Sequence, residues 1–191
     1  MDILGAIRSA PVVDLAILFG LALFMIAGVM QGGIRRLLGM AVITVAFLLA
    51  ANLRDVAGDF LGSNWQQFDL GYNRLLAFAI IFAVLAVAAV VVVELSYRRV
   101  ELSAAHPIVD DVVGGVMGVL EGLLLLVVLV VILGSFSLPL ERPGDLSQVR
   151  TVQDLLLNQS HIAGWLKDVA APPFVHLFSM LLPSDLVSVY P

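Results

Sequence analysis

The chain has 191 residues, of which 61% are hydrophobic and only 13% are charged, with a mean hydropathy of +1.05. A soluble domain is about a quarter charged, so this composition indicates an integral membrane protein. The lack of cysteine excludes disulfides and thiolate metal sites. The net charge of −5 and the absence of a basic patch argue against nucleic-acid binding.

Four segments are long and apolar enough to cross a membrane. Each approaches the ~20 residues that a helix needs to span ~30 Å of hydrocarbon. The third is rich in β-branched residues, but a lone strand in lipid leaves its backbone unpaired, so a helix is favoured. We therefore predict an all-α membrane protein with four transmembrane helices, over residues 12–30, 34–51, 75–96 and 112–134.

The first two spans are joined by the short sequence "QGGIRR", which predicts a tight helical hairpin. Gly32 and the glycine after it permit the reversal, and Gly28, four residues earlier, extends a face of small residues into the turn. Asp14 opens the first span and is expected to lie at the membrane interface as a cap. Arg35 and Arg36 follow the turn.

Spans two and three are separated by an amphipathic stretch containing glycines. Trp65 and Tyr72 within it suit an interfacial position. The connection between spans three and four carries Arg98 and Arg99. Because these arginines and the pair after the hairpin turn must share one side, the positive-inside rule favours placing both in the cytoplasm. Both termini are then extracytoplasmic.

The fourth span opens with the sequence "VDDVVGGVMGVLEG" and carries its polar and small residues on one face. Successive helical residues turn by about 100°, which places six of them within about 120° of one another. Such a ladder of glycines lets another helix approach closely. We therefore predict a packing interface, more readily than a catalytic centre, formed by Gly114, Gly118, Gly122, Asp110, Asp111 and Glu121.

Glu121 lies about 15 Å inside this span, where a carboxylate costs ~2.5–3.5 kcal/mol on insertion scales. Three roles remain open: structural pairing or protonation, ion or proton conduction, and contact with a basic residue of a partner protein. No basic residue of the chain lies at that depth on the span limits above, which keeps the external partner in consideration. Asp110 and Asp111 are expected to cap the N-terminus of their own helix.

The tail, residues 135–191, follows a loop rich in helix breakers. It predicts two short amphipathic helices split at Pro172–Pro173, which lie on the extracytoplasmic membrane surface or against the bundle. The chain has no nucleophile motif, zinc motif or phosphate loop, and its three histidines lack ligand spacing. We therefore expect a non-enzymatic protein with no cofactor and no metal.

The hairpin sequence "DLAILFGLALFMIAGVMQGGIRRLLGMAVITVAFLLA" resembles the start of the colicin V production protein family, CvpA. The matching positions are an Asp that opens span one, a Gly-then-Arg turn and a small residue that closes span two, here Asp14, Gly32, Arg35 and Ala50. The last span is similar too, with Asp110 followed by the three glycines. The tail, which ends in Leu182–Pro183, completes a likeness over nearly the whole chain.

The resemblance implies a four-helix protein of the bacterial inner membrane, linked to toxin or peptide export and to homeostasis of the cell envelope. It would act through membrane or extracytoplasmic partners, or through self-association. A small oligomeric transporter or channel using Glu121, or an accessory subunit of a larger complex, are the alternatives. At the positions of Asp111 and Glu121 family members often carry a basic residue, and at the position of Arg36 they often carry an acidic one. The charges of these positions are therefore exchanged in this chain, which would allow Arg36 to contact Asp111, rather than the deeper Glu121.

Overall fold

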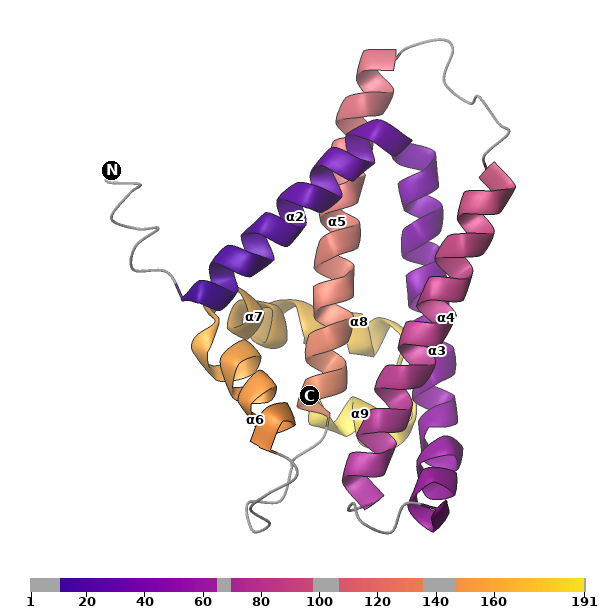
Figure 1. The fold of residues 1–191 in the computed structure, drawn as a ribbon, viewed down its shortest axis with the longest axis vertical. Coiled ribbons are helices and arrows are strands. Elements are labelled where there is room, and N and C mark those ends of the chain that lie inside the picture. Colours follow the sequence, from indigo (N-terminus) through magenta and orange to yellow (C-terminus); the bar gives the residue numbers. More distant parts are fainter. Residues whose placement is uncertain (1–10, 65–69, 98–106, 136–146, 191) are drawn as a thin grey trace.

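The computed structural model describes residues 11–64, 70–97, 107–135 and 147–190, and all regular structure in these ranges is helical (Figure 1). Four of its helices are long and apolar enough to cross a membrane. The prediction of an all-α protein with four spanning helices is confirmed. These helices are α2 (Val12–Gln31), α3 (Gly33–Asn64), α4 (Leu70–Tyr97) and α5 (Pro107–Gly134).

Helix α3 continues well beyond residue 51, where the apolar segment ends, and reaches Asn64. The polar continuation stays helical because it packs closely on the start of α4. Gly58 lies against the backbone of Arg74, and the Arg74 guanidinium donates to Asp59 at 3.0 Å. The predicted interfacial residue Trp65 lies outside the described residues.

Helices α2 and α3 leave their shared turn and diverge, with α5 between them in Figure 1. The extensive contacts are between α3 and α4, between α2 and α5, and between α3 and α5. Helix α5 therefore holds together two arms that touch each other little beyond the turn.

The main hydrophobic core lies where α3, α4 and α5 meet the C-terminal tail. Phe47, Phe78 and Val128, one from each of the three helices, are completely buried. Phe174 of the tail packs its ring against Phe47, with 5.4 Å between centroids. The tail thus shares one core with the spanning helices, because its apolar face fills the space between the diverging arms.

The tail helices are not divided at Pro172–Pro173 as predicted. The two prolines occupy the first turn of α8, where a missing N–H costs nothing. The helical backbone of the tail is instead interrupted at Ser160 and again after Phe178. The elements are α6 (Ser147–Asp154), α7 (His161–Trp165), α8 (Ala171–Leu177), α9 (Ser184–Val189) and the π-helical segments η1 (Leu155–Gln159) and η2 (Leu166–Ala170).

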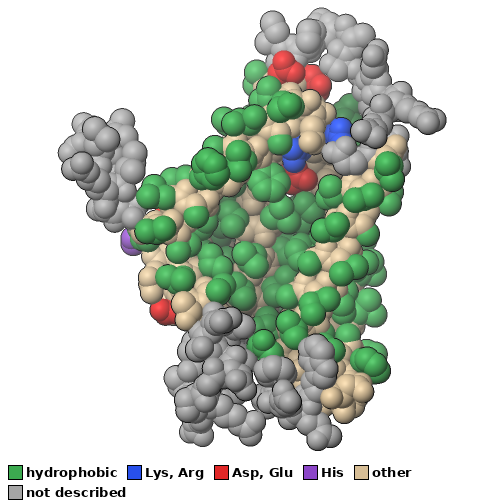
Figure 2. All heavy atoms as spheres, in the orientation of Figure 1, with side chains coloured by type: hydrophobic (Ala, Val, Ile, Leu, Met, Phe, Trp, Pro, Cys, Tyr) green, Lys and Arg blue, Asp and Glu red, His purple; other side chains and the backbone are tan. Residues whose placement is uncertain are grey.

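The outer surface is largely hydrophobic (Figure 2). Apolar side chains of the tail also point outward, among them Trp165, Leu177 and Met180, of which the last is fully exposed. The tail helices pack against the bundle with one face and expose apolar side chains on the other. This arrangement suits a position at the edge of a bilayer.

Candidate functional site

Helices α2 and α5 cross at a seam of glycines. A Cβ added to Gly28 would overlap the carbonyl of Gly114, and one added to Gly118 would overlap the carbonyl of Phe24. Gly122 lies against the Phe24 side chain, where a Cβ would stand 3.1 Å from the ring. Only glycine allows two helix backbones to approach this closely. The partner of the glycine ladder in the fourth span is therefore the first span of the same chain.

The hairpin turn is fixed by Gly32 and Asp110. Gly32 has φ +81°, a conformation that side chains other than glycine rarely adopt. The Asp110 carboxylate accepts a hydrogen bond from the backbone N–H of Gly33 at 3.2 Å. Asp110 lies in the first turn of its own helix, as predicted, and its carboxylate also caps α3. Asp111, the next residue, is exposed.

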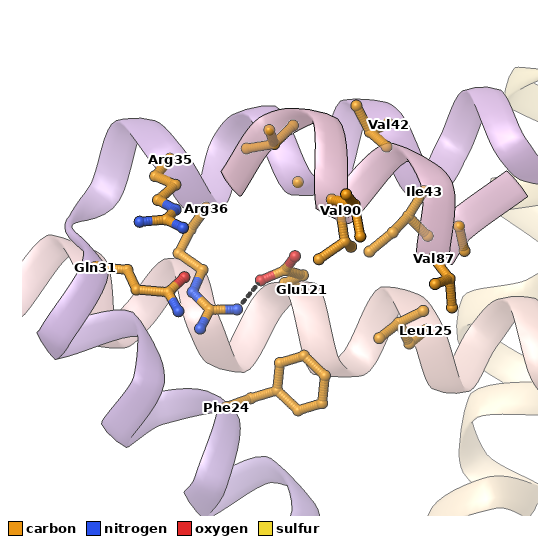
Figure 3. Close-up of a pocket in the computed structure, with 14 residues that line it drawn as sticks. Phe24, Gln31, Arg35, Arg36, Val42, Ile43, Val87, Val90, Glu121 and Leu125 are labelled. Carbon is orange, nitrogen blue, oxygen red and sulfur yellow. Dashed lines mark hydrogen bonds and ion pairs between the residues drawn. The ribbon is translucent and has the colours of Figure 1, made fainter. Parts of the chain in front are cut away.

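Glu121 is paired within the chain. Its carboxylate accepts a hydrogen bond from Nη1 of Arg36, and both side chains are more than nine-tenths buried (Figure 3). The expectation that no basic residue reaches this depth is wrong, and the partner of Arg36 is the deep Glu121 rather than Asp111. A buried carboxylate and a guanidinium neutralise each other, which is how charges are tolerated inside a membrane.

The pair forms because three features bring its partners together. Arg36 is only one turn into α3, and its long side chain extends along the helix to a greater depth than its backbone. Gly39 leaves room for the Glu121 carboxylate, which a Cβ at that position would overlap. The Phe24 ring of α2 lies 5.8 Å from the guanidinium carbon and adds a cation–π contact.

The ion pair lies beside a hollow of about 380 Å³. Residues of all four spanning helices line it, and Figure 3 shows Gln31 and Arg35 at one end, Glu121 nearer the middle and valines of α4 along one side. Figure 2 shows basic and acidic side chains at one end of the molecule, surrounded by hydrophobic ones. The hollow is therefore mostly apolar, with Gln31 and the two arginines toward one end and Glu121 nearer its middle.

Asp14 connects the first span to the tail. Its carboxylate accepts hydrogen bonds from the hydroxyl of Ser160 and from the backbone N–H groups of His161 and Ile162, the last two at 3.2 and 3.3 Å. Ser160 in turn accepts from the N–H of Ala163 at 3.0 Å. Asp14 and Ser160 thus cap α7 together. The predicted cap exists, but it caps a helix 147 residues away in sequence rather than its own.

Arg54, a buried arginine that the sequence did not single out, forms a second ion pair. It is 1% exposed, pairs with Asp185 at the start of α9, and lies 5.8 Å from the ring of Phe78. Its position on the face that continues Phe47 and Ala51 along α3 was the available signal. An arginine on an otherwise buried face of a helix requires a partner.

Five charged residues therefore join one element of the chain to another, namely Asp14, Arg36, Arg54, Asp110 and Glu121. Within the described ranges, no three His, Asp or Glu side chains are grouped so as to hold a metal ion. The candidate site is the junction of α2, α3 and α5 around the Arg36–Glu121 ion pair, together with the hollow beside it. What it can do chemically is neutralise and position charge, through Arg36, Glu121 and Arg35.

A comparison with family models matches residues 13–171 to the colicin V production protein family. Searches of curated proteins and of solved structures find no match. The match covers the four spanning helices, the glycine seam, the ion pair and the tail as far as Ala171, and it agrees with the resemblance seen in the residues. The chain belongs to the colicin V production protein family.

Proposed function

We propose that the protein is a non-catalytic component of the bacterial inner membrane, which supports toxin or peptide export and envelope homeostasis through protein partners. The family links the chain to toxin production as a membrane protein. One observation carries the finer proposal: its buried charged residues each bind a second element of the chain. Asp14 caps α7, Arg36 binds Glu121, and Arg54 binds Asp185. Residues used in this way build a scaffold.

The test is complementation of toxin export in a bacterium that lacks its own family member. The wild-type chain should restore secreted toxin, measured as a zone of killing on an indicator lawn. The double variant Arg36→Met with Glu121→Leu should also restore it, because apolar residues of similar size can replace a structural ion pair. A double variant that is folded and abundant in the membrane, yet inactive, would show that the charges themselves perform the function.

Partner dependence needs a separate measurement. A photo-crosslinking residue at the exposed tail position Val169 should capture the same envelope protein in repeated experiments. A matched probe at the exposed Val84 of α4 controls for contacts made anywhere on the surface. Recovery of the chain alone from both positions would contradict a role through partners.

The hollow beside Glu121 supports a second candidate, a small oligomeric transporter. Purified protein in liposomes would then carry protons or small ions, and Glu121→Gln would abolish the flux. No flux above that of empty liposomes would exclude it. The third alternative, an accessory subunit whose basic residue pairs with Glu121, loses its motivation because Arg36 already provides that partner.

The proposed orientation places the hairpin turn in the cytoplasm and the tail outside. The chain has no cysteine, so single cysteines can be introduced without a background. A membrane-impermeant maleimide added to intact cells should label a cysteine at the exposed tail residue Ser188, and should leave one at the exposed Asp111 unlabelled until the cells are lysed. The reverse pattern would invert the topology.

A further inference from the structure

We propose that α8 and the turn after it, residues 171–182, dip into the hydrocarbon of the leaflet farther from the hairpin turn, where Leu177, Met180 and Leu181 contact acyl chains. These three side chains are 76%, 100% and 59% exposed. A cluster of large apolar side chains that is this exposed is unfavourable in water. The depth of the cluster relative to the bilayer therefore decides what covers it.

Contacts along α3 give the depths of α8 and α9. Phe47, which packs against Phe174 of α8, is fourteen residues after Gly33, or about 21 Å along the helix at about 1.5 Å per residue. Arg54, which pairs with Asp185 of α9, is a further seven residues on, or about 10 Å more. With Gly33 at the near boundary of a hydrocarbon core of about 30 Å, α9 lies at the far boundary and α8 about 9 Å inside it. Any tilt of α3 shortens these heights and places α8 deeper still.

Helix α5 gives a second, independent depth. Its apolar span begins at Asp110, which is hydrogen-bonded to Gly33 of the hairpin turn and so lies at the same level. Val128 is eighteen residues after Asp110, or about 27 Å along the helix. It belongs to the same buried cluster as Ala171 and Val175 of α8. Because this height is also less than the thickness of about 30 Å, both helices place α8 within the hydrocarbon.

The backbone of the turn after α8 is bonded in the way that hydrocarbon requires. An irregular segment at membrane depth must pair its N–H and C=O groups within the protein. Four N–H groups of the turn donate to carbonyls of the tail at 2.8–3.2 Å, those of Phe178, Ser179, Leu181 and Leu182. The Leu181 carbonyl accepts a hydrogen bond from the side-chain amide of Asn52 in α3 at 2.8 Å. A spanning helix thus supplies a donor that water would supply to a turn on the surface.

The charged residues of the tail lie on either side of this segment. Lys167 precedes it and Asp185 follows it, whereas residues 171–182 contain no Lys, Arg, Asp or Glu. A stretch of about 10–14 apolar residues is too short to span and is typical of a re-entrant or interfacial segment. Its one titratable side chain, His176, can be neutral. The partner probe at Val169 precedes the segment, so the lipid contact and the proposed partner contact use different parts of the tail.

The experiment measures depth with spin labels on the full chain in nanodiscs of phosphatidylcholine. The chain has no cysteine, so a nitroxide can be attached at one introduced cysteine, in Leu177→Cys or in Met180→Cys. Collisions of the nitroxide with oxygen and with a water-soluble nickel chelate are then compared. A label in hydrocarbon meets oxygen and escapes the chelate, because oxygen dissolves in the bilayer and the chelate does not. A label among the headgroups meets both reagents.

Two matched positions calibrate the measurement. Val84→Cys is on an exposed face of the spanning helix α4, and Ser188→Cys is at an exposed position of α9. We expect labels at Leu177 and Met180 to behave like the label at Val84, with most of the nickel collisions seen at Ser188 lost. Both reagents reach both faces of a nanodisc, so the result does not depend on orientation. Circular dichroism of each labelled variant shows that it is folded.

Three results would overturn the proposal. Nickel access at Met180 equal to that at Ser188 would place the turn in water. Substantial access of both reagents would place it among the headgroups. Low access of both would show that protein, such as a second copy of the chain, covers this face. None of these results bears on the complementation of toxin export, which tests the proposed function separately.

Discussion

Replacing Glu121 by leucine should destabilise the protein more than any single change at its surface. The substitution leaves Arg36 charged, more than nine-tenths buried and without its carboxylate. Removing one partner of a buried ion pair costs about 3–5 kcal/mol, which raises the unfolded fraction at least a hundredfold at about 1.4 kcal/mol per factor of ten. The complementary variant Arg36→Met should cost less, because a carboxyl group can bind a proton and become neutral, whereas a guanidinium cannot lose one.

The double variant decides whether the two side chains act as a pair. Arg36→Met with Glu121→Leu removes both charges and fills similar volume, so its stability should lie within about 1 kcal/mol of the wild type. The coupling energy, obtained from the two single variants and the double variant, should then be at least about 2 kcal/mol. Unfolding in mixed micelles by increasing mole fractions of dodecyl sulfate, followed by circular dichroism, provides the four free energies.

A control cycle on the Asp59–Arg74 pair sets the scale for surface charges. These side chains are 57% and 36% exposed, so solvent screens their attraction and a coupling energy below about 1 kcal/mol is expected. Equal coupling in both cycles, or single-variant costs at Arg36 and Glu121 that simply add in the double variant, would refute the reasoning that burial makes this pair important.

Three further predictions concern the seam, the tail and the alkaline limit of stability. Gly118→Ala forces α2 and α5 apart and should lower the free energy of unfolding by about 1–3 kcal/mol. Gly20→Ala is the control, because a Cβ there meets nothing within 4 Å, and it should be neutral or slightly stabilising in the same unfolding assay. Ser160→Ala removes half of the α7 cap and should lower stability by about 0.5–2 kcal/mol, which hydrogen exchange would detect as faster exchange in residues 161–177. Unchanged exchange would mean that Asp14 caps the helix alone. Burial raises the pKa of Tyr190 from 10.0 to about 12, so the folded state keeps the phenol proton to a higher pH than the unfolded state does. The stability contributed by this group should be complete below pH 10 and should fall between pH 10 and 12. Tyr190→Phe should abolish that loss in an alkaline titration of unfolding.

The fold was predictable from sequence because lipid restricts the choice of structure. Four apolar segments of sufficient length have no alternative to a helix, and the four helices are present. The glycines of the last span were predicted to meet another helix because small residues let a second helix backbone approach closely. The sequence did not reveal that this helix is α2, since a glycine ladder carries no information about its partner.

The polar contacts were less predictable because each joins residues far apart in the chain. Arg36 and Glu121 are separated by 85 residues, and Arg54 and Asp185 by 131. Estimating depth from the backbone position placed Arg36 too near the membrane surface, because the estimate ignored how far an arginine side chain extends. Similarly, the rule that places an acid in the first turn of its own helix did not reveal that the Asp110 carboxylate also reaches the N–H of Gly33 on a neighbouring helix.

The positions of these contacts bear on how a partner could engage the protein. The tail is fastened to the first span through Asp14, which is 5% exposed, and to the second through Arg54, which is 1% exposed. Its release would separate Asp14 from Ser160 and Arg54 from Asp185, and would open the core around Phe47, so the free energy of release is large compared with thermal energy. A partner therefore meets the tail and the spanning helices as one assembled surface, and deletion of residues after 160 should destabilise the membrane helices themselves rather than remove an independent arm.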